Sequence, residues 1–175
     1  KDGSRNVINE AFRILRTNLE FVNDSSKKEN IFCTTSYNPG NGKTFITLNI
    51  AVSLAIKGKK VLLIDGDMRH TSLSKAFDSP GIGISGYLAG KIDDVDMIIK
   101  HDSEHGLDVI PTGAIPPNPT ELLYSPRLKQ LLDIVRERYD YIFIDCPPSD
   151  IVADTSIITK YADRTIFIIR AGMLE

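Results

Sequence analysis

Several residue types and patterns that define whole classes of protein are scarce in this sequence. Its 175 residues include no tryptophan and only two cysteines, and its formal net charge is −2 with no block of lysine and arginine. Small disulfide-stapled domains need many more cysteines, so that class is excluded. The slightly acidic balance argues against a dedicated nucleic-acid surface, and we expect no nucleic-acid partner.

Membrane and secretory features are also missing from the sequence. No run of apolar residues approaches the roughly 20 residues of a membrane span, and the N-terminus lacks the pattern of a signal peptide. The two cysteines, Cys33 and Cys146, lie in apolar runs without the spacing of a zinc or redox motif. We expect both to be buried reduced thiols, which suits a cytoplasmic location.

Short apolar runs alternate with amphipathic segments along the chain. This alternation is typical of right-handed βαβ units, so we predict an α/β fold in which a mainly parallel sheet has helices on both faces. The predicted strands cover residues 31–35, 60–64, 107–111, 141–145 and 164–170. The predicted helices cover residues 8–22, 44–57, 71–77, 92–100, 120–124, 126–138 and 152–161, and residues 80–90 form a glycine-rich stretch.

The length suits one α/β domain with a continuous core and is short for two. We therefore predict a single domain over residues 1–175. The last predicted strand lies almost at the end of the sequence, which is an abrupt place for a domain to stop. We expect the domain to be truncated at its C-terminus.

The segment from Asn38 to Phe45 connects the first predicted strand to a predicted helix. Its glycines allow backbone N–H groups to close around phosphate oxygens, while Lys43 reaches the outer phosphates and Thr44 offers a hydroxyl to Mg²⁺. The G-x-x-x-x-G-K-[ST] pattern is incomplete, because Tyr37 occupies the position of the first glycine. The alternative is a glycine-rich turn that caps a helix. The residues predicted to bind the nucleotide here are Pro39, Gly40, Asn41, Gly42, Lys43, Thr44 and Phe45.

Two acidic elements follow the second and fourth predicted strands. Asp65 and Asp67 leave a buried strand and point to the same side if the backbone is extended. Asp145 follows four apolar residues, the Walker B placement, where a carboxylate holds Mg²⁺ directly or through water. The alternatives are a helix cap at Asp67 and an ordinary strand end at Asp145. Because ligands bind beyond the carboxyl ends of parallel strands, we predict a nucleoside-triphosphate site at this edge of the sheet.

These segments together resemble the cytoplasmic catalytic domain of bacterial tyrosine kinases (BY-kinases) of the capsule and exopolysaccharide biosynthesis type, in the P-loop Min/Par-like superfamily. The resemblance covers nearly the whole chain. Partitioning ATPases with the same phosphate loop carry a signature lysine where this chain has Asn38, which favours the kinase. The matching segments are residues 10–19, which are similar to the family's E-x-x-R-x-x-R helix, the phosphate loop 39–44, the variant Walker A′ element 65–69, and residues 116–123 and 145–148.

The resemblance implies an ATP- and Mg²⁺-dependent protein tyrosine kinase that acts in trans on a C-terminal tyrosine cluster, which has no counterpart among the six tyrosines here. The implied catalytic residues are Lys43, Asp65, Asp67 and Asp145; the implied metal ligands are Thr44, Asp67 and Asp145; and Arg69 joins the nucleotide-binding residues. Asp65 is our choice for orienting or deprotonating the acceptor hydroxyl. Two alternatives stay open: a Min/Par-type partitioning ATPase, and a nucleotide-binding regulatory module without kinase activity.

The resemblance also gives the first helix a role. We assign residues 1–24 to an amphipathic oligomerisation helix, on which Glu10, Arg13 and Arg16 share one polar face. The ordinary interpretation of this stripe is a pair of intrahelical salt bridges worth about 0.2–0.5 kcal/mol each. The resemblance implies instead a homo-oligomeric ring. It further implies a membrane-bound polysaccharide co-polymerase activator, fused or separate, that places the domain at the inner face of the cell membrane.

Overall fold

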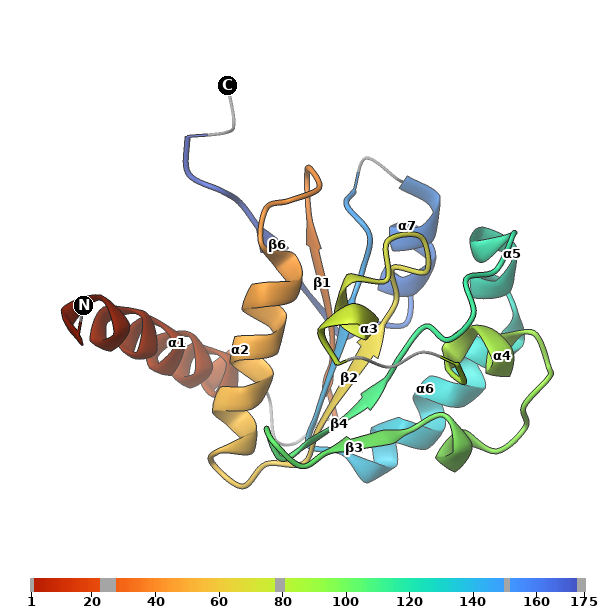
Figure 1. Cartoon of the computed structure of the whole chain (residues 1–175), viewed down its shortest axis with the longest axis horizontal. Helices are drawn as coiled ribbons and strands as arrows, with labels where there is room; N and C mark the ends of the chain where they lie inside the picture. Colours follow the sequence, from red (N-terminus) through yellow and green to blue (C-terminus); the bar gives the residue numbers. More distant parts are fainter. Residues whose placement is uncertain (1, 23–27, 78–80, 150–151, 173–175) are drawn as a thin grey trace.

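The computed structural model describes residues 2–22, 28–77, 81–149 and 152–172 (Figure 1). Its strands are β1 (Ile31–Ser36), β2 (Val61–Asp65), β3 (Lys100–Asp102), β4 (Leu107–Ile110), β5 (Tyr141–Asp145) and β6 (Arg164–Ile168). Its helices are α1 (Asp2–Val22), α2 (Lys43–Ala55), α3 (Ser72–Ala76), α4 (Ile84–Leu88), the 3₁₀ turn η1 (Val95–Met97), α5 (Pro119–Leu123), α6 (Pro126–Arg138) and α7 (Val152–Thr159).

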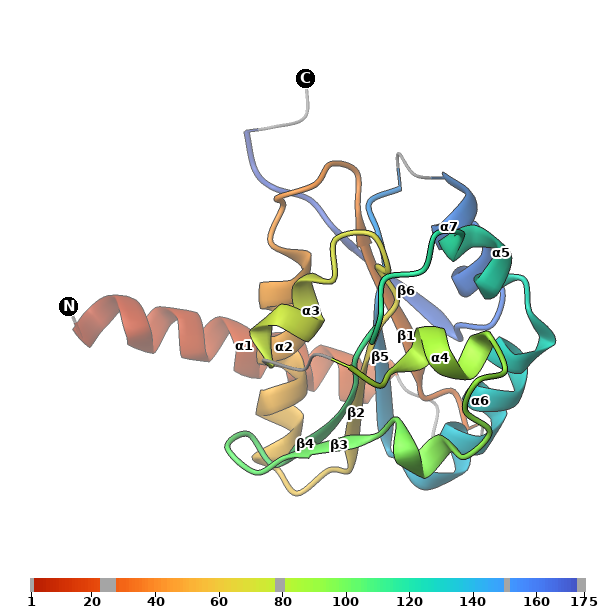
Figure 2. The same cartoon turned by 45° about the vertical axis from the view of Figure 1, so that its right-hand side comes forward.

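The strands form one sheet in the order β3-β4-β2-β5-β1-β6. All neighbouring pairs are parallel except β3 and β4, which are antiparallel. Helices α1, α2 and α3 pack on one face of the sheet, and α4, α5, α6 and α7 pack on the other (Figures 1 and 2). The predicted α/β architecture, a mainly parallel sheet with helices on both faces, is therefore confirmed.

The three central strands form because their sequences are almost continuously apolar. Every residue of β1, β2 and β5 is buried, as expected for parallel strands that are covered by helices on both sides. On the α2 face, Phe32 stacks on Phe143 with the ring centroids 5.3 Å apart. On the opposite face lies Cys33, and both Cys33 and Cys146 are buried free thiols, as predicted.

The predicted helix over residues 92–100 is wrong. The segment contains the short turn η1, and its end begins the edge strand β3. The Asp94 side chain accepts a hydrogen bond from the backbone N–H of Asp96 at 2.9 Å and caps this short turn. From Lys100 on, the chain pairs with β4 instead of continuing a helix. The pairing of β3 with β4 then follows from a reversal at Gly106, whose φ is 68°.

Helix α4 lies in the stretch that the sequence suggested was simply glycine-rich. A side chain at Gly83 is impossible in this arrangement, because a Cβ would lie 2.2 Å from the carbonyl oxygen of Pro111. The N–H groups of Ile84 and Ser85 donate to the carbonyls of Pro111 and Thr112 at 2.8 and 3.0 Å. The glycine therefore allows the start of α4 to dock on the chain that leaves β4.

Helix α1 begins at Asp2, well before the predicted periodic segment, and projects from the body of the molecule (Figures 1 and 2). Phe12, Leu15 and Leu19 pack against the α2 side of the core, while Phe21 is 91% exposed. Residues 1, 23 and 24 of the predicted helix lie outside the described residues, as do residues 173–175. Within the described part of the chain, no helix combines the length and the apolar character that crossing a membrane requires.

Candidate nucleotide-binding site

The predicted phosphate loop connects β1 to α2 at the carboxyl edge of the sheet (Figure 1). Gly40 and Gly42 have φ values of 77° and 87°, a left-handed conformation that residues with a Cβ rarely adopt. Gly42 precedes α2, and no side chain caps this helix. The free N–H groups of the first turn and the helix dipole thus make a site for an anion. Residues Pro39 and Gly40 are exposed, residues 41–44 are half-buried, and Phe45 is exposed.

Thr44 and Asp145 join this loop to the end of β5. The Thr44 hydroxyl donates a hydrogen bond to Oδ2 of Asp145 at 2.6 Å. Asp145 is only 1% exposed, and its Oδ1 has no hydrogen-bond partner among the described residues. Burial raises the pKa of Asp145 from 3.8 to about 7, against the opposing effects of the Thr44 hydrogen bond and the Lys43 charge.

Asp65 lies directly across from Asp145 in the parallel register of β2 and β5. Its side chain is fully buried, and Oδ2 accepts hydrogen bonds from the N–H and the hydroxyl of Ser74 at 2.8 and 2.5 Å. Oδ1 has no hydrogen-bond partner in the described chain. Burial is the main cause of a raised pKa at Asp65, opposed by the Ser74 hydrogen bonds.

Asp67 is buried close to these two carboxylates and contributes to raising the pKa of each. Its Oδ1 accepts hydrogen bonds from the N–H groups of Arg69 and His70 at 3.2 and 3.1 Å. Asp67 therefore holds the turn that precedes α3, while the N-cap of α3 itself is Thr71, so Asp67 is not the helix cap of the alternative interpretation. The turn ends at Thr71, whose φ of 52° lies in the left-handed region.

Arg69 was predicted to bind the nucleotide, but its contacts run to α5 and α7. Its Nε donates to Oδ2 of Asp154 at 2.9 Å, and its Nη2 donates to the hydroxyl of Thr120 at 3.0 Å. Sequence reasoning missed both partners. Thr120 lies in the matching segment 116–123, but the resemblance gave it no role. No feature of the sequence marked Asp154 as functional, because an acidic residue in a helix is usually exposed to solvent.

The donors at this edge of the sheet fit Mg²⁺ together with a nucleotide. Oδ1 of Asp145 is a buried carboxylate oxygen without a hydrogen-bond partner among the described residues, and the Thr44 hydroxyl contacts the same carboxylate. Mg²⁺ prefers hard oxygen ligands and usually takes one or two carboxylates, with substrate phosphates and water completing its shell. No group of three or more His, Cys, Asp or Glu side chains in the described part of the chain could hold a metal ion. The protein donors therefore suit a metal that arrives with phosphates better than a metal caged by side chains alone.

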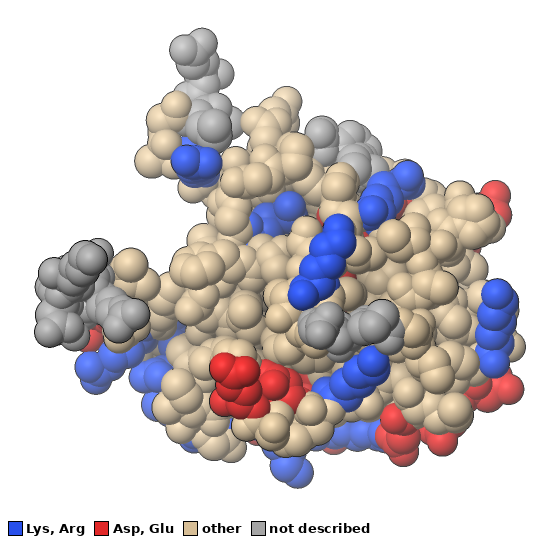
Figure 3. All heavy atoms as spheres, viewed as in Figure 1, with Lys and Arg blue, Asp and Glu red and all other residues tan. Residues whose placement is uncertain are grey.

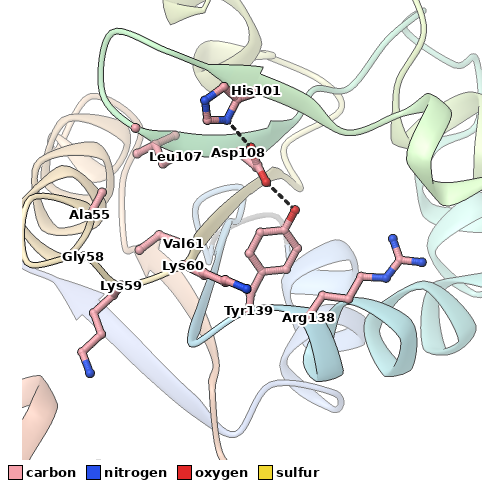
Figure 4. A pocket seen from close by; sticks show the side chains of 11 residues that line it. Ala55, Gly58, Lys59, Lys60, Val61, His101, Leu107, Asp108, Arg138 and Tyr139 are labelled. Carbon is pink, nitrogen blue, oxygen red and sulfur yellow. Dashed lines mark hydrogen bonds and ion pairs between the residues drawn. The ribbon is translucent and has the colours of Figure 1, made fainter.

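A separate cavity of about 490 Å³ lies at the opposite edge of the sheet, beside the first residues of β2 and β4 (Figure 4). Inside it, Asp108 bridges His101 Nδ1 and the Tyr139 hydroxyl, with both contacts at 2.7 Å. Burial and the hydrogen bond to Asp108 raise the pKa of Tyr139. Lys59 and Arg138 point away from the cavity centre (Figure 4), so these two side chains do not converge on one anion. On the molecular face shown in Figure 3, basic and acidic side chains are interspersed.

The fold and the phosphate loop define an ATP-binding P-loop domain of the α/β class. The family model for the AAA domain matches residues 30–173. The chain is 37% identical over 168 residues to the tyrosine-protein kinase CpsD of Streptococcus agalactiae serotype III (strain NEM316), covering 95% of this chain and 71% of CpsD. This chain therefore belongs to the AAA-domain family and, within it, to the family of bacterial tyrosine-protein kinases, as the motifs indicated.

Comparisons with two further proteins show how much of each chain is similar in sequence and in fold. The chain is 38% identical to the tyrosine-protein kinase Etk of Escherichia coli (strain K12), but it spans only 22% of Etk's length. The solved kinase domain of Etk superposes with a TM-score of 0.91 and 36% identity, over 95% of this chain and 65% of that domain's chain. The septum site-determining protein MinD of Pyrococcus horikoshii, solved with Mg-ADP, superposes with a TM-score of 0.65 and 26% identity, over 79% of this chain and 57% of MinD.

Proposed function

We propose that this domain is an ATP- and Mg²⁺-dependent protein tyrosine kinase. The observation that carries the proposal is the placement of Asp65 and Asp145 side by side, each with one unpartnered buried oxygen, next to the phosphate loop. A nucleotide site needs one such carboxylate for the metal, and a kinase needs a second to orient its acceptor. The tyrosine-kinase names of the relatives support the choice of acceptor.

The proposed roles follow from position and charge. Backbone N–H groups from Gly40 to Thr44 would bind phosphate oxygens, and Lys43 would neutralise the outer phosphates. Mg²⁺, held by Thr44, Asp67 and Asp145, would supply further positive charge against the phosphates. Asp65 would orient the tyrosine hydroxyl and accept its proton, a role that a raised pKa favours. Phosphoryl transfer depends mainly on positioning and charge stabilisation, so these few groups suffice.

Arg69 has a supporting role in this proposal. Its backbone N–H helps to hold Asp67, while its guanidinium is engaged by Asp154 and Thr120. In this proposal Arg69 would support nucleotide binding indirectly, because it holds Asp67 and the surrounding turn in position.

The wider assembly proposed for this chain rests on the family resemblance. We propose a homo-oligomeric ring in which the projecting α1 contacts a neighbouring subunit through Glu10, Arg13 and Arg16. Arg13 pairs with Glu10 at 3.2 Å and stays exposed, whereas Arg16 donates to the carbonyl of Ser53 at 3.1 Å and is partly committed to α2. A membrane-bound polysaccharide co-polymerase would be the activator, fused or separate, and would place the kinase at the inner face of the cell membrane in capsule or exopolysaccharide synthesis.

A Min-type ATPase is the second candidate, because MinD shares the fold and was solved with Mg-ADP. Asn38, which replaces the signature lysine of those ATPases, argues against it. Incubation with γ-labelled ATP, Mg²⁺ and a tyrosine-rich peptide separates the candidates. Label on peptide tyrosine supports the kinase, and release of free phosphate alone supports the ATPase. Neither product, with ATP still bound, indicates a regulatory module.

The control for this assay is Lys43→Met. One charge-assisted contact to phosphate is worth roughly 1.5–3 kcal/mol, so we expect at least tenfold weaker ATP binding and no transfer of label. The half-buried Lys43 supports no apolar core, so the variant should stay folded. Unchanged labelling in Lys43→Met would contradict the phosphate-loop assignment.

A further inference from the structure

The two oxygens of the Asp65 carboxylate have opposite surroundings. Oδ2 accepts two hydrogen bonds from Ser74, one from its N–H at 2.8 Å and one from its hydroxyl at 2.5 Å. Oδ1 is buried and has no hydrogen-bond partner among the described residues. The carboxylate therefore has one oxygen held by two donors and one buried oxygen without a hydrogen-bond partner.

The direction of the Ser74 hydrogen bond is also determined. Oγ of Ser74 accepts a hydrogen bond from the backbone N–H of Thr112 at 2.8 Å. A hydroxyl carries a single hydrogen, and the Thr112 N–H can only donate, so the hydroxyl hydrogen of Ser74 is directed at Asp65. Ser74 is thus held from the chain that follows β4, and it fixes Asp65 from α3.

From this geometry we infer that Ser74 is a positioning residue for Asp65. By holding Oδ2 through two donors, it restricts rotation of the carboxylate and fixes the position of Oδ1, the oxygen that the proposed function leaves for the acceptor hydroxyl. The inference rests on the proposed kinase function, in which Asp65 acts on the acceptor. It adds a residue that none of the sequence motifs marks, nine positions beyond the aspartate it holds.

Kinetics of Ser74 variants test this role. Ser74→Ala should lower kcat by about tenfold or more, as expected for the loss of a hydrogen bond to a charged group, with the KM for ATP within twofold of the wild type. Ser74→Thr, which restores a hydroxyl, should recover most of the rate. Ser74→Cys keeps the volume with a weak donor and should resemble Ser74→Ala. The matched controls are Ser72→Ala, an exposed serine of the same helix, and Ser85→Ala, a buried serine whose hydroxyl bonds to the carbonyl of Ala114.

A double-mutant cycle with Asp65→Asn separates positioning from a general structural role. If Ser74 acts through Asp65, adding Ser74→Ala to Asp65→Asn should cost no further rate. The inference would be overturned if Ser74→Ala lowered the rate by the same factor in the wild type and in Asp65→Asn. It would also be overturned if Ser74→Ala and Ser85→Ala lowered the wild-type rate equally.

A readout without activity keeps the inference distinct from the proposed function. Crystal structures of the ligand-free Ser74→Ala and Ser74→Cys variants should show the Asp65 carboxylate rotated or in two orientations, while Ser72→Ala leaves it unchanged. An unmoved carboxylate in both Ser74 variants would overturn the inference. If the wild type transfers no phosphate to tyrosine, the proposed function fails, and these structures still decide whether Ser74 sets the orientation of Asp65.

Discussion

The hydroxyl of Thr44 lies 2.6 Å from Oδ2 of Asp145 and donates a hydrogen bond to it. This contact ties the first turn of α2 to the end of β5, so the phosphate loop and the buried carboxylate form one unit before any ligand is bound. The carboxylate retains its second oxygen for a cation. The site is therefore preorganised in its protein parts.

Asp145 should make the ligand-free domain less stable as the pH rises. Its pKa is raised from 3.8 to about 7 in the folded state, so the folded state binds a proton more tightly than the unfolded state does. That contribution to stability is complete below about pH 4 and is lost as the pH rises to about 7. Asp145→Asn removes the effect. Denaturant unfolding without nucleotide or Mg²⁺ should find the variant more stable than the wild type at pH 8.

The stability difference between Asp145→Asn and the wild type should change across this pH window. The free energy of unfolding of Asp145→Asn should rise relative to that of the wild type between about pH 4 and 7. Above about pH 7 the difference should stay constant. A difference that does not vary with pH would show that Asp145 titrates normally. Asp133→Asn, which changes an exposed carboxylate on α6, is the matched control.

The ion pair between Arg69 and Asp154 predicts unequal costs for its two partners. Asp154 has a side chain only 3% exposed, whereas that of Arg69 is 40% exposed. Arg69→Ala leaves a buried carboxylate with only the Thr120 hydroxyl as partner, which should cost about 1–3 kcal/mol. Asp154→Asn leaves an arginine that water can solvate and should cost less than about 1 kcal/mol. Urea unfolding measures both values, and equal costs would contradict the asymmetry of burial.

Arg13 should affect self-association without affecting stability. Its pair with Glu10 is exposed, with 67% and 59% of the two side chains accessible, so its loss should change the free energy of unfolding by no more than about 0.5 kcal/mol. Light scattering should nevertheless show smaller assemblies for Arg13→Ala. Lys129→Ala on α6 is the matched control, because its pair with Asp133 is similarly exposed. Identical assemblies in both variants would reject a role for α1 in the ring.

The parts of the fold that the sequence predicts well are those set by local pattern. Strand β1 begins with three consecutive apolar residues and strands β2 and β5 with four each, and each predicted boundary is correct within about one residue. The phosphate loop follows because glycine spacing and a following helix depend on neighbouring residues only. Thr44 and Asp145 could be paired in advance because parallel strands deliver their carboxyl ends to one edge.

The failures occur where distant chain segments decide the local structure. The predicted helix of residues 92–100 is reduced to the turn η1, and Lys100 begins a strand that pairs with β4. Arg69 is directed by Asp154, which is 85 residues away. Ser74 contacts Asp65 from α3, a helix that follows the left-handed Thr71. No periodicity or motif in the sequence encodes these contacts.

The most direct test of the central claim compares nucleotide binding and phosphotransfer in Asp65→Asn. Because Asp65 is assigned to the acceptor and not to the phosphates, the variant should bind ATP in the presence of Mg²⁺ within about twofold of the wild type. Phosphotyrosine formation on a tyrosine-rich peptide, followed by mass spectrometry, should fall by at least about a hundredfold, the lower range for loss of a general base. Wild-type phosphotransfer in Asp65→Asn, or full rescue of this variant by added Mg²⁺, would contradict the account.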